Sequence, residues 1–305
     1  DQFLAATRAA AIAAWVWRGK GDAKRADKAA VDALRAAFAT IDCDALVVIG
    51  EGRKDDSYEI PAGERVGTGK GPALDIAIDP LECTTNTALN KPNAIAVLAV
   101  GPRGTLYHGP DGYMEKLAVG RAAACVVDLD ASPKVNIKKI TKALGKKITD
   151  ITIAVLDRPR HEQLIQEILA TGARVELSTD GDVSMAIRTC IPGSGVDALM
   201  GVGGSTEAVL AATAVKHMGG VMLCRWKPKD EAQIRWLHEA GIKKFDAILS
   251  ADDLSRSGET QFIATGVIAG PLLRGVEHHE RRFVTHSMVV SRDGVRYITN
   301  EECRM

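Results

Sequence analysis

Acidic side chains follow several aliphatic segments of the chain, at points where buried strands would end. Glu51 and Asp79 each come directly after such a segment, Glu82 lies three residues past Asp79, and Glu207 follows a Gly-rich stretch. In α/β sheets, sites form outside the carboxyl ends of strands, where turns present side chains together. Carboxylates gathered there repel one another unless a cation neutralises them, and oxygen-only ligands select hard ions. A single acid of this kind more often caps a helix or faces solvent, but the combination predicts a site for Mg²⁺ or Mn²⁺.

The elements that must position these acids follow from the hydrophobic pattern. The first half predicts helices at 3–17 and 24–38 and buried strands at 46–49, 73–78 and 94–100. Pro80 cannot continue a central strand, so we expect the chain to turn there. That turn would carry Asp79, Glu82 and Thr84 together.

The second half alternates strands and helices more regularly. Strands are predicted at 151–156, 174–177, 196–200 and 220–224, and helices at 161–170, 183–189, 207–217 and 231–240. This alternation favours a parallel sheet with covering helices. Polar, irregular sequence at 128–147 favours a domain boundary, dividing an N-terminal α+β metal-site domain, 1–135, from a C-terminal α/β domain, 136–305.

Composition excludes several other classes of protein. Acidic and basic residues balance at 39 each, which argues against a nucleic-acid or membrane-surface binder. The six cysteines lack the close spacing of a zinc or redox site, and no apolar run reaches the roughly 18 residues of a membrane span. We therefore expect a cytoplasmic protein with no nucleic-acid or membrane partner.

The motifs around the acids resemble those of a known enzyme family. The runs 48–52 and 75–82 are similar to class II fructose-1,6-bisphosphatases of bacteria, which belong to the lithium-sensitive phosphatase superfamily. The similarity continues, in order, through 94–100, 110–117, 158–161, 180–183, 201–204 and 264–267. From about residue 150 it is greatest to cyanobacterial dual fructose-1,6/sedoheptulose-1,7-bisphosphatases. The resemblance implies a layered α/β sandwich of the sugar-phosphatase type with two subdomains.

The resemblance also implies an activity and its residues. The reaction would be hydrolysis of the 1-phosphate of fructose 1,6-bisphosphate, with sedoheptulose 1,7-bisphosphate as a further substrate, in a homodimer or homotetramer. Thr84 would orient or activate the attacking water; Asp55 would assist it or be a solvated loop acid. The implied metal ligands are Asp27, Glu51, Asp79, Glu82 and Glu207. The implied substrate-binding residues are Thr84, Thr85, Tyr113, Arg158, Arg160, Asp180, Asp182 and Gly203.

Two departures from the family pattern keep alternatives open. Cys83 stands where the family usually has Gly, and Ala23 where it usually has Lys. A catalytically weakened homologue that binds metal and sugar phosphate is therefore a second hypothesis. An inositol-phosphate or nucleotide phosphatase of the same superfamily is a third, although the segment 158–182 argues against it. Judged without the resemblance, Arg158 and Arg160 are equally compatible with plain surface residues.

Overall fold

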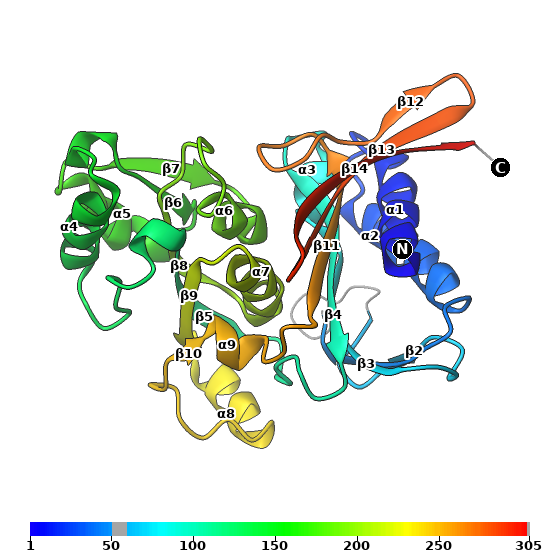
Figure 1. Ribbon diagram of the computed structural model, residues 1–305, viewed down its shortest axis with the longest axis horizontal. Helices are drawn as coiled ribbons and strands as arrows, with labels where there is room; N and C mark the ends of the chain where they lie inside the picture. Colours follow the sequence, from blue (N-terminus) through cyan, green and yellow to red (C-terminus); the bar gives the residue numbers. More distant parts are fainter. Residues whose placement is uncertain (51–59, 304–305) are drawn as a thin grey trace. The chain divides into compact units, whose positions relative to one another are not determined.

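The computed structural model describes residues 1–50 and 60–303, which form two compact units (Figure 1). The first unit holds residues 1–111 and the C-terminal residues from 256 onwards, and the second holds 112–255. The chain therefore leaves the first unit, builds the second and returns. The boundary predicted between residues 135 and 136 falls inside helix α4 (Pro133–Leu144). That segment is a capped helix that buries Ile137 and Ile140, and its polar face gives it the composition of a linker.

A mixed sheet forms the centre of the first unit. Its strands in the described ranges are β1 (Asp44–Ile49), β2 (Arg65–Val66), β3 (Ala73–Glu82), β4 (Ala94–Pro102), β11 (Gln261–Ile268), β12 (Glu277–His279), β13 (Arg282–Ser291) and β14 (Gly294–Cys303). They run in the order β12-β13-β11-β4-β3-β1-β2, and β14 pairs with β13. Only the β1–β3 pairing in this described set is parallel. The predicted strands of the first half are present, whereas β11–β14 were not predicted.

Two helices cover one face of this sheet, with α1 (Gln2–Trp15) packed beside α2 (Ala23–Phe38) (Figure 1). Leu34 and Phe38 of α2 belong to the same buried cluster as Ile76 of β3 and Leu98 of β4. The short helix α3 (Thr84–Ala88) follows β3 directly. The core therefore lies between the helix layer and the sheet, and the end of β3 leads straight into the predicted site.

The second unit has a sheet with helices on both faces. Its strands run in the order β10-β9-β5-β8-β6-β7. Their bounds are β5 (Tyr113–Val119), β6 (Thr152–Leu156), β7 (Arg174–Ser178), β8 (Ala198–Gly204), β9 (Val221–Trp226) and β10 (Leu249–Ser250). The remaining helices are α4, α5 (Glu162–Leu169), α6 (Asp182–Arg188), α7 (Ser205–His217), α8 (Glu231–Glu239) and α9 (Ala251–Leu254), with 3₁₀ turns η1 (Arg121–Ala123), η2 (Ile148–Asp150) and η3 (Pro159–His161). Helices α4 and α5 lie on one face, and α6 and α7 on the other (Figure 1).

These layers confirm the predicted layered α/β fold but correct the strand directions. Strands β6, β7 and β8 are parallel, as predicted. Strand β5 lies between β8 and β9 and is antiparallel to both, so the sheet is mixed. The sequence concealed β5 because Glu115 and Lys116 interrupt its apolar run. No helix within the described ranges is long and apolar enough to cross a membrane.

Candidate functional site

Asp79 and Glu82 lie near the end of β3, where the strand contains a bulge in place of the turn predicted at Pro80. In the antiparallel ladder with β4, Asp79 faces Val97 and Glu82 faces Ile95. Strand β3 therefore has one extra residue over this stretch. Side chains alternate between the two faces of a strand, so the extra residue brings both carboxylates to the same face. Pro80 is tolerated because proline fits at a bulge and the pairing with β1 ends before it.

Three of the predicted metal ligands in the first unit are buried. Asp79 is 2% exposed, Glu82 4% and Asp27 5%. Asp27 lies in α2, which packs against β3 and whose start is capped by the Asp22 carboxylate, 3.0 Å from the backbone nitrogen of Arg25. Burial disfavours the charged form and raises the pKa of Asp27 to about 6. Buried carboxylates of this kind are stable in their ionised form when a cation or donor compensates them.

The segment after Glu82 has an unusual backbone conformation. Cys83 has φ 71° and ψ 47°, the left-handed conformation that glycine adopts at little cost and other residues at about 1–2 kcal/mol. Its side chain is buried. The Thr84 hydroxyl donates to the carbonyl oxygen of Leu81 at 3.0 Å, and Thr85 is exposed. Cys83, where the resemblance leads us to expect Gly, therefore has a backbone conformation that glycine adopts more easily.

The described residues do not include every predicted member of the metal and water site. Glu51 and Asp55 lie outside the described residues. Within 1–50 and 60–303, no three His, Cys, Asp or Glu side chains are grouped so that they could hold a metal ion. Asp27, Asp79 and Glu82 belong to the first unit and Glu207 to the second. The five-residue ligand set therefore stays a prediction.

Glu207 lies in the first turn of α7 in the second unit. The N-terminal end of a helix favours a negative side chain, because the unpaired backbone N–H groups there carry partial positive charge. Ser205, the first residue of α7, exchanges two hydrogen bonds with Gly112: backbone to backbone at 2.8 Å, and Gly112 N–H to the Ser205 hydroxyl at 2.8 Å. These bonds attach the start of α7 to the chain that enters β5.

Tyr113 and Arg160 lie in contact in the second unit. The Arg160 guanidinium lies 5.1 Å from the centroid of the Tyr113 ring, and the ammonium of Lys229 lies 5.9 Å from it. Arg160 donates to the carbonyl oxygen of Val202 from Nη2 at 2.8 Å and from Nε at 3.2 Å. Partial burial lowers the pKa of Arg160. Arg160 is thus held in one orientation, and its planar guanidinium has donors left for a doubly charged group such as a phosphate.

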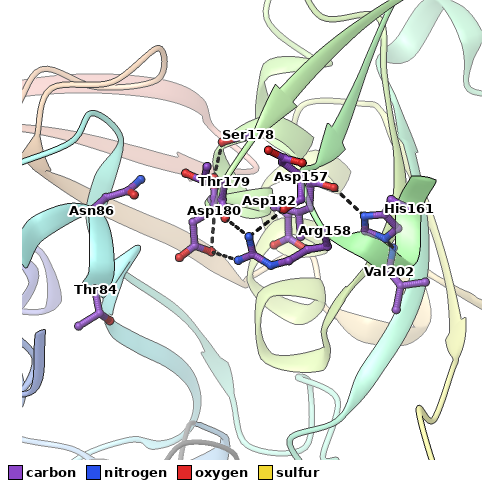
Figure 2. Close-up of polar contacts among 12 residues, drawn as sticks. Thr84, Asn86, Asp157, Arg158, His161, Ser178, Thr179, Asp180, Asp182 and Val202 are labelled. Carbon is purple, nitrogen blue, oxygen red and sulfur yellow. Dashed lines mark hydrogen bonds and ion pairs between the residues drawn. The ribbon is translucent and has the colours of Figure 1, made fainter. Parts of the chain in front are cut away.

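Arg158 and Asp180 form a second polar group (Figure 2). Arg158 donates to the carbonyl oxygens of Asp157, at 3.1 Å, and Thr179, and its Nη2 lies 3.9 Å from a carboxylate oxygen of Asp180. Burial raises the pKa of Asp180 to about 6, an effect that the charge of Arg158 opposes and that of Glu207 reinforces. Two predicted substrate-binding residues are therefore in mutual contact.

Asp182 has a partner that the sequence did not predict. The Lys116 ammonium lies 2.7 Å from its carboxylate, and the two side chains are 2% and 6% exposed. A Cβ on Gly203 would lie 2.0 Å from that carboxylate and 3.0 Å from the ammonium, so only glycine leaves room for the pair. Asp182 is therefore fixed by β5 and β8, and Gly203 makes space for it. Lys116 is 66 residues away in sequence, and no local pattern signals the contact.

His161 is the second residue that the sequence analysis missed. It is buried, its Nδ1 is 2.7 Å from the carbonyl oxygen of Leu156, and its Nε2 is 2.8 Å from the backbone nitrogen of Val202 (Figure 2). The Val202 N–H can only donate, so Nε2 accepts and Nδ1 carries the proton that is donated to Leu156. Burial lowers the pKa of His161, which keeps this ring neutral. The sequence feature that could have identified His161 as a site residue is its place directly after Arg160.

Comparison with known proteins covers the chain from end to end. The family model described as bacterial fructose-1,6-bisphosphatase, glpX-encoded, matches residues 1–302. Fructose-1,6-bisphosphatase 1 class 2 of Escherichia coli (strain K12) is 38% identical over 301 residues, which cover 95% of this chain and 90% of that protein. Fructose-1,6-bisphosphatase class 2 of Shigella flexneri matches to the same extent. The chain therefore belongs to the glpX-encoded, class 2 family of bacterial fructose-1,6-bisphosphatases.

Proposed function

We propose that this protein hydrolyses the 1-phosphate of fructose 1,6-bisphosphate, releasing inorganic phosphate and the sugar monophosphate, in a reaction that requires Mg²⁺ or Mn²⁺. The observation that carries the proposal is the pair of buried acids at the end of β3, Asp79 and Glu82, in a chain that matches a bisphosphatase family over residues 1–302. Phosphoryl transfer depends mainly on positioning and charge neutralisation. Buried acids that share one face of a strand suit that chemistry.

The acids have the donor chemistry of a hard-metal site. Asp79 and Glu82 are buried and share one face of β3, and burial raises the pKa of Asp27, as expected for an acid whose charge needs compensation. Asp27, Glu51, Asp79, Glu82 and Glu207 are the proposed ligands, and all offer carboxylate oxygens. Divalent cations bound there would neutralise phosphate charge and lower the pKa of the attacking water.

The chain's own residues would also orient the attacking water and hold the substrate. Thr84, two residues after Glu82, has its hydroxyl fixed by a hydrogen bond to the Leu81 carbonyl oxygen and is proposed to orient the attacking water. Arg160, braced by Val202 and Tyr113, is proposed to bind the distal phosphate. Asp180 and Asp182 are proposed to accept hydrogen bonds from sugar hydroxyls, with Asp182 held in place by its ion pair with Lys116.

A phosphate-release assay tests the proposal. Purified protein should release phosphate from fructose 1,6-bisphosphate when Mn²⁺ or Mg²⁺ is present, and chelation should abolish the activity. Sedoheptulose 1,7-bisphosphate and an inositol monophosphate, assayed in parallel, would identify the substrate range. Faster turnover of the inositol phosphate than of either bisphosphate would contradict the assignment.

A weakened enzyme is the second candidate, and the conformation of Cys83 favours it. A buried thiol in a left-handed conformation stands between Glu82 and Thr84, where the family usually has Gly. Strain there would displace both neighbours from their working positions. No turnover, together with intact binding of fructose 1,6-bisphosphate and Mn²⁺ in calorimetry, would support this candidate over an active phosphatase.

We further propose a cytoplasmic homodimer or homotetramer. The scattered cysteines favour a reducing compartment. Sedimentation of the purified protein would measure its oligomeric state. A monomer would contradict the proposal.

A further inference from the structure

The N–H and C=O groups of Val202 are both bound by consecutive side chains of the segment 158–161. His161 accepts from the N–H at 2.8 Å, and Arg160 donates to the C=O at 2.8 Å. We infer that His161 is a positioning residue for the sugar-phosphate site, which through Val202 holds Arg160 and Gly203 in the geometry that binds the distal phosphate. This inference rests on the proposed phosphate-binding role of Arg160.

The imidazole of His161 spans the place where β6 and β8 separate. These strands pair in parallel at Ile153 with Ala198 and at Ala154 with Leu199. If that register continued, Leu156 would lie beside residue 201 and next to Val202, close enough for the strands to bond directly. Instead the ring lies between the Leu156 carbonyl and the Val202 N–H, and bonds to both. The distance between the strand ends at the site is therefore set by the width of this ring.

Strand β8 is shaped to accept the ring. Gly201 has φ +145°, and a Cβ there would lie 3.1 Å from Nε2 of His161. The next glycine, Gly203, makes room for the Lys116–Asp182 pair. Gly201 and Gly203 flank Val202, and each lies close to one of these side chains. A shift of Val202 would therefore move the backbone that contacts His161 on one side and the Lys116–Asp182 pair on the other.

Arg160 needs this restraint because it borders open space. It lines a cavity of about 450 Å³ in the second unit, together with His161, Glu115 and Lys227. A long arginine beside such a cavity can adopt several rotamers, and fixing one costs conformational entropy. The Val202 carbonyl selects one rotamer only while Val202 itself is held, which is the role that His161 performs.

Three substitutions of His161 distinguish the effects of the two hydrogen bonds that its ring makes. His161→Gln keeps an acceptor near the Nε2 position, His161→Asn keeps a donor near the Nδ1 position, and His161→Phe keeps the ring without either. Arg160→Met tests the phosphate-binding role directly. The matched control is His238→Gln, an exposed histidine of the same unit that contacts Phe245.

The readouts are KM and kcat for fructose 1,6-bisphosphate, and dissociation constants for fructose 6-phosphate and Mn²⁺ from calorimetry. In His161→Phe, KM and the fructose 6-phosphate constant should each rise about tenfold, the scale of one or two lost hydrogen bonds, with kcat changed less. His161→Gln should regain most of this loss and His161→Asn little. Mn²⁺ affinity and the behaviour of His238→Gln should match the parent protein.

The outcomes distinguish this inference from the function on which it rests. If Arg160→Met weakens fructose 6-phosphate binding but His161→Phe does not, the positioning role is wrong. Equal losses in Mn²⁺ and sugar-phosphate affinity, with a lower melting temperature in all three His161 variants, would make His161 a purely structural residue and overturn the inference. If the parent protein neither binds fructose 6-phosphate nor cleaves the bisphosphate, the proposed function fails first.

Discussion

The predicted site residues of the two units are stabilised in different ways. In the first unit, the described residues that we predict as metal ligands are the buried acids Asp27, Asp79 and Glu82, which lie in two neighbouring elements, α2 and β3. In the second unit the charged residues are matched in pairs, such as Lys116 with Asp182 and Arg158 with Asp180. The partners of these pairs come from distant parts of the sequence.

This difference indicates which kind of ligand each unit is suited to bind. Buried acids favour external cations, because burial raises the cost of their negative charge. Paired groups are already compensated, so they can present a fixed pattern of donors and acceptors to a neutral or doubly charged ligand. On the proposed function, the first unit supplies most of the metal ligands, and the second supplies Glu207 and the residues that recognise the sugar and its distal phosphate.

The largest effect is expected from breaking the buried pair of the second unit. Lys116→Met leaves the Asp182 carboxylate buried without its cation, which should cost about 3–5 kcal/mol of unfolding free energy. Urea denaturation measures the change. The control Lys146→Met removes an exposed partner of Asp197 and should cost less than about 1 kcal/mol. Lys116→Met combined with Asp182→Asn should recover part of the loss; no recovery would show that the charge pair is not the cause.

A smaller effect, on metal affinity and turnover, is expected from removing one of the buried acids of the first unit. Asp79→Asn keeps an acceptor for the Leu81 N–H, which lies 3.0 Å away, but removes a charge. Metal affinity and kcat should fall about 10–100-fold, as for other losses at metal sites. The melting temperature without metal should not fall, because like-charge repulsion is reduced. Asp32→Asn, on the exposed side of α2, is the control. An unchanged thermal shift on adding Mn²⁺ would remove Asp79 from the ligand set.

The smallest effect is expected at Cys83. Glycine at this position avoids the cost of about 1–2 kcal/mol that a residue with a Cβ pays for the left-handed conformation. It also makes the unfolded chain more flexible, which lowers the unfolding free energy by about 0.5–1 kcal/mol. Cys83→Gly should therefore raise the unfolding free energy by about 0.5–1 kcal/mol, measured in urea, and should raise kcat. Cys83→Ala retains the Cβ and should gain nothing. If both variants gain equally, the thiol, and not the backbone, is responsible.

Local patterns were sufficient for the elements whose burial is visible in the sequence. The N-terminal helices, the aliphatic strands and the second-half alternation were predicted from periodicity. Strand β5 was missed because Lys116 makes it look polar, and helix α4 was taken for a linker because one face is lysine-rich. In both cases the burial of the element depends on residues far away in the sequence, and hydrophobic periodicity gives no information about such contacts.

The sequence by itself determined the family, the layered α/β class and the acidic residues that follow aliphatic runs, because these depend on residue identity and short spacing. Tertiary structure decided that Asp79 and Glu82 share a face, since one extra residue in β3 reverses the alternation expected of a plain strand. It also decided that Lys116 neutralises Asp182 and that His161 bridges β6 and β8. Lys116 and Asp182 are 66 positions apart and His161 and Val202 are 41 positions apart, so only the folded chain brings them within hydrogen-bonding distance.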